Sequence, residues 1–134
     1  MRIGLLTTSF PRSPDDIAGA FVLGFARALA ARGHEIEVLA PEPREDCVAP
    51  SWPGVRTIHV PYLRPRALER TFYGAGVPDN VRRDPLAALG LLPFSIALTR
   101  ACRMRAPHWD ALVSHWALPS ALAAGVARRS GQRH

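Results

Sequence analysis

Short apolar runs that end at turn residues alternate with helical segments along this chain, and this alternation constrains its fold more than any other feature. The apolar runs predict strands at 2–7, 35–40, 55–60 and 109–115. The other periodic segments predict helices at 18–31, from Asp84 toward Arg105, and at 119–129. Pro93 should break or kink the second helix near Leu92. Strands that alternate with helices favour a parallel, doubly wound, Rossmann-like α/β sheet of about four strands with flanking helices.

Length and composition limit the class of protein. With 134 residues, of which 48% are apolar, the chain is expected to form one soluble domain. No apolar run approaches the roughly 20 residues of a membrane span, and the N-terminal run is too short for a signal peptide. Cys47 and Cys102 fit neither a metal spacing nor a disulfide framework. We therefore expect a cytoplasmic protein without a metal site.

The charge is concentrated in the middle of the chain. All 17 basic residues are arginine, and residues 56–105 hold nine of them against three acidic residues. The segment 61–83 within this region has no periodicity and is expected to be irregular. A basic region of this kind faces phosphates or an anionic membrane surface, or is simply a solvated surface; both interpretations stay open. Aromatic residues are not interleaved with the arginines, so we expect no nucleic-acid partner.

Two of the predicted helical segments almost lack a polar face. Arg27 is the polar residue between positions 18 and 31, and Ser120 is the polar residue between 117 and 127. A helix that is apolar all round is usually covered all round. Either both helices lie against something besides the sheet, or their small alanine and glycine side chains are tolerated at the surface.

The loop after the first strand is the expected ligand site, because ligands of doubly wound sheets bind at the carboxyl ends of the strands. Neither a G-x-G-x-x-G fingerprint nor a phosphate-binding P-loop occurs in the sequence. Gly19 lies at the start of a predicted helix, where backbone N–H groups could approach an anion. Gly19 could equally serve only to shape the loop.

His115 ends the fourth predicted strand, at the same edge of the sheet. An imidazole there is well placed to form a hydrogen bond with a ligand hydroxyl, although it could also merely cap the following helix. The sequence contains no convincing zinc-ligand set, catalytic triad or pair of catalytic carboxylates.

Two stretches together resemble the N-terminal domain of the family 4 glycosyltransferases, which have the two-domain GT-B fold. The family typically opens with a strand, a proline loop, a glycine motif, a helix with an Arg-Gly-His-Glu turn, and a strand that ends in proline. The first matching stretch is RIGLLTTSFPRSPDDIAGAFVLGFARALAARGHEIEVLAP. The second is WDALVSHWALPSALAAGVARR, which resembles the family's strand ending in histidine and the helix behind it.

The resemblance implies retaining transfer of a sugar from a nucleotide diphosphate sugar to a glycan or lipid acceptor, with no obligatory metal and no other cofactor. It implies that Ala18, Gly19 and Ala20 form the loop that faces the donor phosphates or nearby acceptor groups. His115 would form hydrogen bonds at the reaction centre, and Trp116 would lie near the acceptor. Many members have two adjacent glycines where this chain has Ala18-Gly19.

The length of the chain departs from the family. The C-terminal nucleotide-sugar-binding domain has no counterpart here, so residues 1–134 are expected to be an incomplete acceptor-side domain that is inactive by itself. Such a chain is either a fragment, a frameshifted remnant, or a subunit whose partner is a separately encoded C-terminal domain. The expected role of the enzyme is the assembly of surface polysaccharide or glycolipid. A lipid acceptor would place the protein at the inner membrane face. The alternative is a non-catalytic α/β binding or interaction module, or a remnant.

Overall fold

Four parallel strands form one sheet in the order β3-β2-β1-β4. The computed structural model describes residues 1–43, 50–73 and 76–131. The strands and their bounds are β1 (Arg2–Leu6), β2 (Glu35–Pro41), β3 (Val55–Val60) and β4 (Ala111–Ser114). Each predicted strand is therefore confirmed, with ends that differ by at most two residues.

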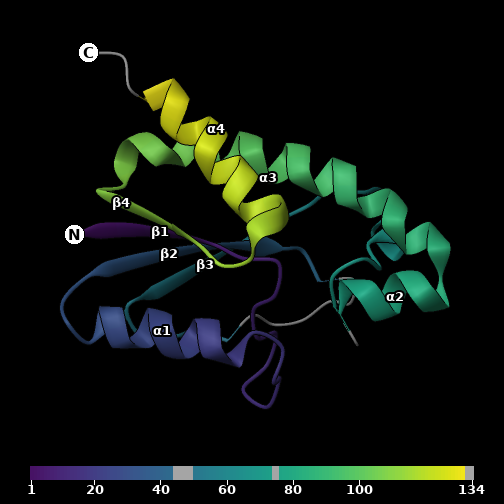
Figure 1. The fold of residues 1–134 in the computed structure, drawn as a ribbon. Helices are drawn as coiled ribbons and strands as arrows, with labels where there is room; N and C mark the ends of the chain where they lie inside the picture. Colours follow the sequence, from purple (N-terminus) through teal and green to yellow (C-terminus); the bar gives the residue numbers. More distant parts are fainter. Residues whose placement is uncertain (44–49, 74–75, 132–134) are drawn as a thin grey trace.

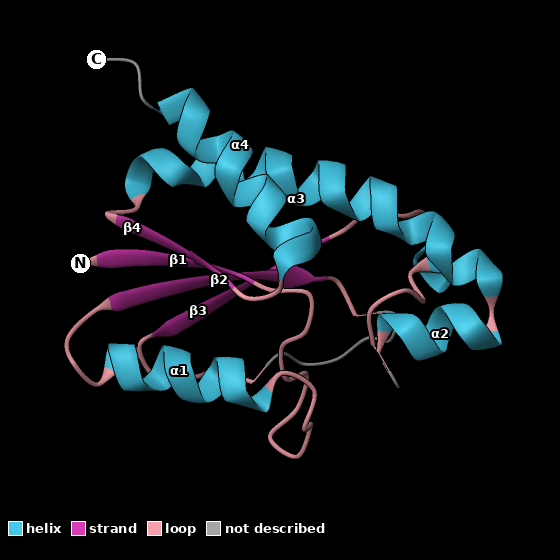
Figure 2. Ribbon diagram, viewed as in Figure 1, coloured by secondary structure: helices cyan, strands magenta, loops and turns pink. Residues whose placement is uncertain are grey.

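Helices cover both faces of the sheet (Figures 1 and 2). Their bounds are α1 (Ala20–Ala30), α2 (Val77–Arg83), α3 (Leu91–Arg105) and α4 (Leu122–Gly131), with short 3-10 helices at Arg66–Leu68, Pro85–Gly90 and Ala106–His108. Helix α1 lies on one face, and α3 and α4 lie side by side on the other. The doubly wound α/β class predicted from the sequence is confirmed.

The two central strands are apolar on both sides because both faces of the sheet are covered. Leu5 pairs with Val38, and both belong to the core shared with α1. Leu6 pairs with Leu39, and both belong to the core shared with α3 and α4. All four side chains are fully buried. The apolar runs in the sequence thus reflect two separate cores, one on each face.

Two predictions about helices need correction. The segment 61–83, expected to be irregular, contains α2 and the short helix Arg66–Leu68. Pro93 does not break the second predicted helix, because it lies in the first turn of α3, where a missing backbone N–H costs no helical hydrogen bond. The change from 3-10 to α geometry falls instead between Gly90 and Leu91.

The helical segment Pro85–His108 is 24 residues long with a mean hydropathy of 1.5 over 18 residues. By length and composition alone it could cross a membrane, contrary to the expectation from the sequence that no apolar run is long enough. In this fold its inward side chains Phe94, Leu98 and Cys102 are fully buried against the sheet. A core helix of a globular domain passes the same test of length and composition.

The almost wholly apolar helices are covered on one side only within the described residues. Phe21 and Phe25 of α1 and Leu122 of α4 are exposed large apolar side chains. Small residues such as Gly24 and Ala28 also lie at the surface. Of the two cysteines, Cys102 is a buried free thiol whose burial raises its pKa to about 11, and Cys47 lies outside the described residues.

Candidate functional site

The loop between β1 and α1 is folded back on itself at the carboxyl edge of the sheet. The Thr7 hydroxyl donates to the Ser9 carbonyl at 2.8 Å and accepts the Ser9 N–H at 3.2 Å. Gly19, the N-cap of α1, is buried in the left-handed region with φ +71°. A Cβ at this position would collide with the Ser9 carbonyl. Because the left-handed backbone of Gly19 cannot belong to a right-handed helix, α1 begins at Ala20 rather than at Ala18.

Asp16 holds the middle of the same loop. Its Oδ2 atom accepts hydrogen bonds from the Arg12 Nε at 2.6 Å and the Arg12 amide at 3.0 Å, and its Oδ1 accepts the Ala18 amide at 3.0 Å. Burial alone would raise the pKa of Asp16, but these hydrogen bonds outweigh it and hold the pKa below its usual value. The loop is therefore fixed around an ionised carboxylate.

Arg12 also links this loop to the segment before α2. Its guanidinium lies 4.7 Å from the centre of the Tyr73 ring, a cation–π contact. The Tyr73 hydroxyl donates to the Pro41 carbonyl, at the end of β2, at 2.7 Å. These contacts tie the ends of two neighbouring strands to one rigid loop.

Two of the three amides expected to face an anion are already engaged within the loop. The Ala18 amide donates to Asp16, and the Ala20 amide donates to the Ile17 carbonyl at 3.2 Å. An anion at the start of α1 would therefore depend on the amides of Gly19 and Phe21, or on a rearrangement of the loop.

His115 continues the pairing of β4 with β1, because its amide donates to the Leu6 carbonyl at 2.8 Å. Its imidazole meets the rings of Phe21 and Phe25 edge to face, with centroids 5.8 and 5.3 Å apart. Burial lowers the pKa of His115 below 6.5, so the ring is neutral at physiological pH. Its Nε2 atom is buried without a hydrogen-bond partner among the described residues.

Trp116 has an unusual backbone conformation for a bulky residue. Its φ is +78°, and it is the one non-glycine residue with positive φ in the described parts of the chain. Such strain persists only where the surrounding structure enforces it, and it is concentrated at functional sites. The Trp116 ring is exposed and lies 5.9 Å from the Phe21 ring, edge to face.

The fold thus gathers the residues singled out in the sequence at one edge of the sheet. Phe21, two positions after Gly19, contacts both His115 and Trp116. Phe21 and Phe25 were not among the residues predicted from the sequence. Their spacing of four residues, which places both on one face of a helix, was the signal available to find them. Together they give His115 an apolar wall.

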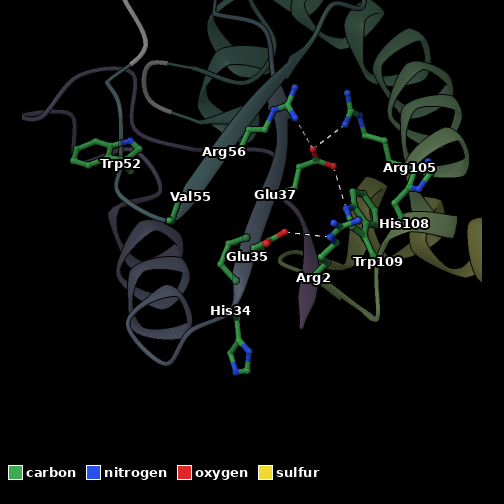
Figure 3. Close-up of a pocket in the computed structure, with 12 residues that line it drawn as sticks. Arg2, His34, Glu35, Glu37, Trp52, Val55, Arg56, Arg105, His108 and Trp109 are labelled. Atoms are coloured by element: carbon green, nitrogen blue, oxygen red, sulfur yellow. Dashed lines mark hydrogen bonds and ion pairs between the residues drawn. The ribbon is translucent and has the colours of Figure 1, made fainter.

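A separate hollow of about 720 Å³ lies at the opposite, amino-terminal edge (Figure 3). At its centre the Glu37 carboxylate accepts hydrogen bonds from Arg105 at 2.8 Å and from the Trp109 indole N–H at 3.0 Å. Arg56 lies 3.9 Å away from the same carboxylate. This cluster was not predicted from the sequence either, although strand alternation places Glu37 on the same face of the sheet as Leu39.

The carboxyl edge offers hydrogen bonding from a neutral imidazole beside exposed aromatic rings. Such surfaces suit a ligand with both hydroxyl groups and apolar C–H faces. Within the ranges that the structure describes, no three His, Cys, Asp or Glu side chains lie close enough together to hold a metal ion. The Glu37 cluster instead has its charge balanced by its own arginines, as expected of a structural ion pair.

Comparison with known proteins adds one finding. A family model described as a glycosyl transferase 4-like domain matches residues 18–134. This range includes α1, the Arg-Gly-His-Glu turn and β4 with His115. No curated protein matches the chain.

Proposed function

Since the chain belongs to the glycosyltransferase 4-like family, we propose that it forms the acceptor-side wall of a retaining glycosyltransferase. The donor would be a nucleotide diphosphate sugar, and the acceptor a glycan or lipid. The observation that carries the proposal is the placement of His115, Trp116 and the start of α1 at one edge of the sheet, joined by Phe21.

His115 suits a hydrogen-bonding role toward a sugar. A neutral imidazole can donate or accept, and its Nε2 atom has no partner among the described residues. This atom is covered, so a ligand reaches it only when neighbouring side chains move. Phe21 and Phe25 are themselves exposed, and rotation of their side chains would open the path.

Turnover should require a second wall that faces this edge. Transfer needs the donor oriented against the acceptor and water excluded from between them. Here Phe21, Trp116 and Leu118 are exposed at the edge, so this domain supplies one side of such a cleft. We propose that a nucleotide-sugar-binding domain, in the same or a separate chain, supplies the other side, and that no metal is obligatory.

Binding can be tested with UDP-glucose and GDP-mannose as probes, in the enzyme assembled with the proposed nucleotide-sugar-binding domain. We expect either probe to shift the NMR signals of His115 and of the Trp116 indole, and the shifts to be lost in His115→Ala. His108→Ala is the matched control, because His108 is an exposed histidine at the opposite edge. Shifts confined to the surroundings of Glu37, or shifts that survive in His115→Ala, would contradict the proposal.

Catalysis is tested in the assembled enzyme, with both domains present. His115→Ala should lower the rate of sugar transfer about 100-fold, the usual effect of removing one hydrogen-bond partner from the transition state. His108→Ala should leave the rate unchanged. An equal rate in the His115 variant would remove this residue from the reaction centre.

A non-catalytic binding module is the second candidate function. The engaged amides of Ala18 and Ala20 favour it, because they weaken the expected phosphate contact. This alternative predicts that glycans bind at Trp116 while nucleotide sugars neither bind nor turn over. The same NMR experiment with a free glycan probe separates the two functions.

A further inference from the structure

The segment of Pro85–Gly90 and α3 is apolar on two opposite sides. Its inward residues are buried: Phe94, Leu98 and Cys102 pack against the sheet, and Ala87 and Gly90 lie beside Thr71. On the other side lie Leu86, Leu89, Leu92 and Ile96, here called the leucine stripe, each between 62% and 69% exposed. Their spacing of three or four residues places them along one side of the helical segment. A continuous exposed apolar stripe of this kind marks an interaction surface.

Arginines flank the leucine stripe at both ends. Arg82 and Arg83 end α2 just before it, and Arg100 and Arg103 occupy the next turns of α3 after Ile96. All four side chains are exposed. The nearby carboxylates are Asp79, 3.9 Å from Arg82, and Asp84, which pairs with Arg70 at 3.0 Å. The flanks therefore carry a net positive charge.

The apolar surface continues from the stripe toward the edge of the sheet. A groove of about 1020 Å³ lies between α3 and the edge strand β3. Ile58, Leu63, Ala97 and Met104 line it, together with Ile96 of the stripe. Ile96 thus belongs to both surfaces, and Arg64 and Arg100 lie among the lining residues.

We propose that the leucine stripe docks this domain on an anionic phospholipid membrane. The leucine and isoleucine side chains enter the boundary between headgroups and acyl chains, and the flanking arginines contact lipid phosphates. This is the arrangement by which amphipathic helices bind the membrane interface, with apolar burial and charge attraction acting together. The helix lies on the membrane rather than across it, because its inward side chains are packed in the core of the domain.

The charges favour a membrane over a second copy of the chain. In a two-fold symmetric dimer through the stripe with antiparallel helices, Arg82 and Arg83 of one copy would face Arg100 and Arg103 of the other. Like charges placed together disfavour such a pair. Lipid phosphates neutralise both ends of the stripe at once. Docking is independent of whether the domain transfers sugar, so the two proposals can fail separately.

Co-sedimentation of the 134-residue chain with vesicles tests the proposal. We expect binding to phosphatidylcholine vesicles that contain phosphatidylglycerol, weaker binding to phosphatidylcholine alone, and a loss of binding as salt is raised. Leu92→Glu and Ile96→Glu should each weaken binding by at least about tenfold. Ile17→Glu is the matched control, because Ile17 is a 90% exposed apolar residue in the loop before α1, away from the stripe. It should bind like the unchanged chain.

Each of the other results would overturn the proposal. The substituted side chains are exposed, so the variants are expected to fold, and circular dichroism checks that they do. Equal binding to neutral and anionic vesicles would contradict the role of the arginines. Unchanged binding of Leu92→Glu and Ile96→Glu would contradict the role of the stripe. A dimer that Ile96→Glu dissociates, without vesicle binding by the unchanged chain, would show that a second copy covers the surface.

Discussion

The ring of Phe25 meets the imidazole of His115 edge to face, with centroids 5.3 Å apart, and so joins α1 to the carboxyl end of β4. The two residues are far apart in sequence, and no local pattern links them. Phe25 shields one side of the imidazole from water. Burial is the cause of the lowered pKa of His115, and Phe25 is one of the groups that bury the imidazole.

Replacement of Phe25 by alanine should raise the pKa of His115 toward its ordinary value of 6.5. The reason is that hydration of the ring favours its charged form. An NMR titration of the imidazole signals measures the pKa directly. His59 on β3 is the internal control, since its pKa is lowered chiefly by its own burial elsewhere in the fold and should not change. A His115 pKa that falls or stays constant would show that another group shields the ring.

Asp16→Asn should destabilise the domain by about 1–2 kcal/mol at neutral pH, because it removes charge-assisted hydrogen bonds from Arg12. The folded-state pKa of Asp16 is lowered, so its contribution is present above about 3.8 and is lost as the pH falls through the folded value. The difference between the two proteins in urea denaturation should therefore shrink in acid. Asp15→Asn, at the exposed neighbouring carboxylate, should have little effect. A difference that persisted at low pH would assign the effect to something other than charge.

Gly19→Ala and Gly24→Ala should have opposite effects on stability. At Gly19 the positive φ and the nearby Ser9 carbonyl oppose a methyl group, so we expect a loss of about 1–3 kcal/mol. At Gly24, inside α1, a Cβ would meet nothing within 4 Å. Alanine there should stabilise the helix by about 0.5–1 kcal/mol. Thermal denaturation of the two variants makes the comparison, and a stabilising Gly19→Ala would refute the strained geometry of the loop.

Glu37→Ala should destabilise the domain by about 2–3 kcal/mol. It leaves Arg105 and the Trp109 N–H without their partner inside the amino-terminal hollow. The expected loss of stability is smaller than for a fully buried ion pair, because 34% of the Arg105 side chain is exposed. Glu35→Ala is the control on the same strand, where the Arg2–Glu35 pair is exposed and should contribute less than about 0.5 kcal/mol. Equal effects of the two substitutions in urea denaturation would mean that Glu37 acts as a surface charge.

The sequence by itself determined the strands, most of the helices and the edge of the sheet at which Gly19 and His115 lie. The apolar runs at residues 3–6 of β1 and 38–40 of β2 are buried on both sides. Such runs can be recognised without knowledge of the fold, because burial on two faces leaves no room for polar alternation. Parallel strands share one carboxyl edge, so Gly19 and His115 could be assigned to the same edge from their positions alone. The sequence motifs also indicated the family that the match over residues 18–134 then established.

The tertiary structure decided which side chains meet. The hydrogen-bond partners of Glu37 lie 68 and 72 residues away along the chain, and no local pattern specifies such pairs. Helix α2 escaped prediction because it is short and has no buried residue, so it shows no apolar periodicity. The engagement of the Ala18 and Ala20 amides depended on how the loop folds around Asp16. Local sequence sets the elements through burial and backbone preference, whereas contacts between elements depend on packing that only the assembled fold defines.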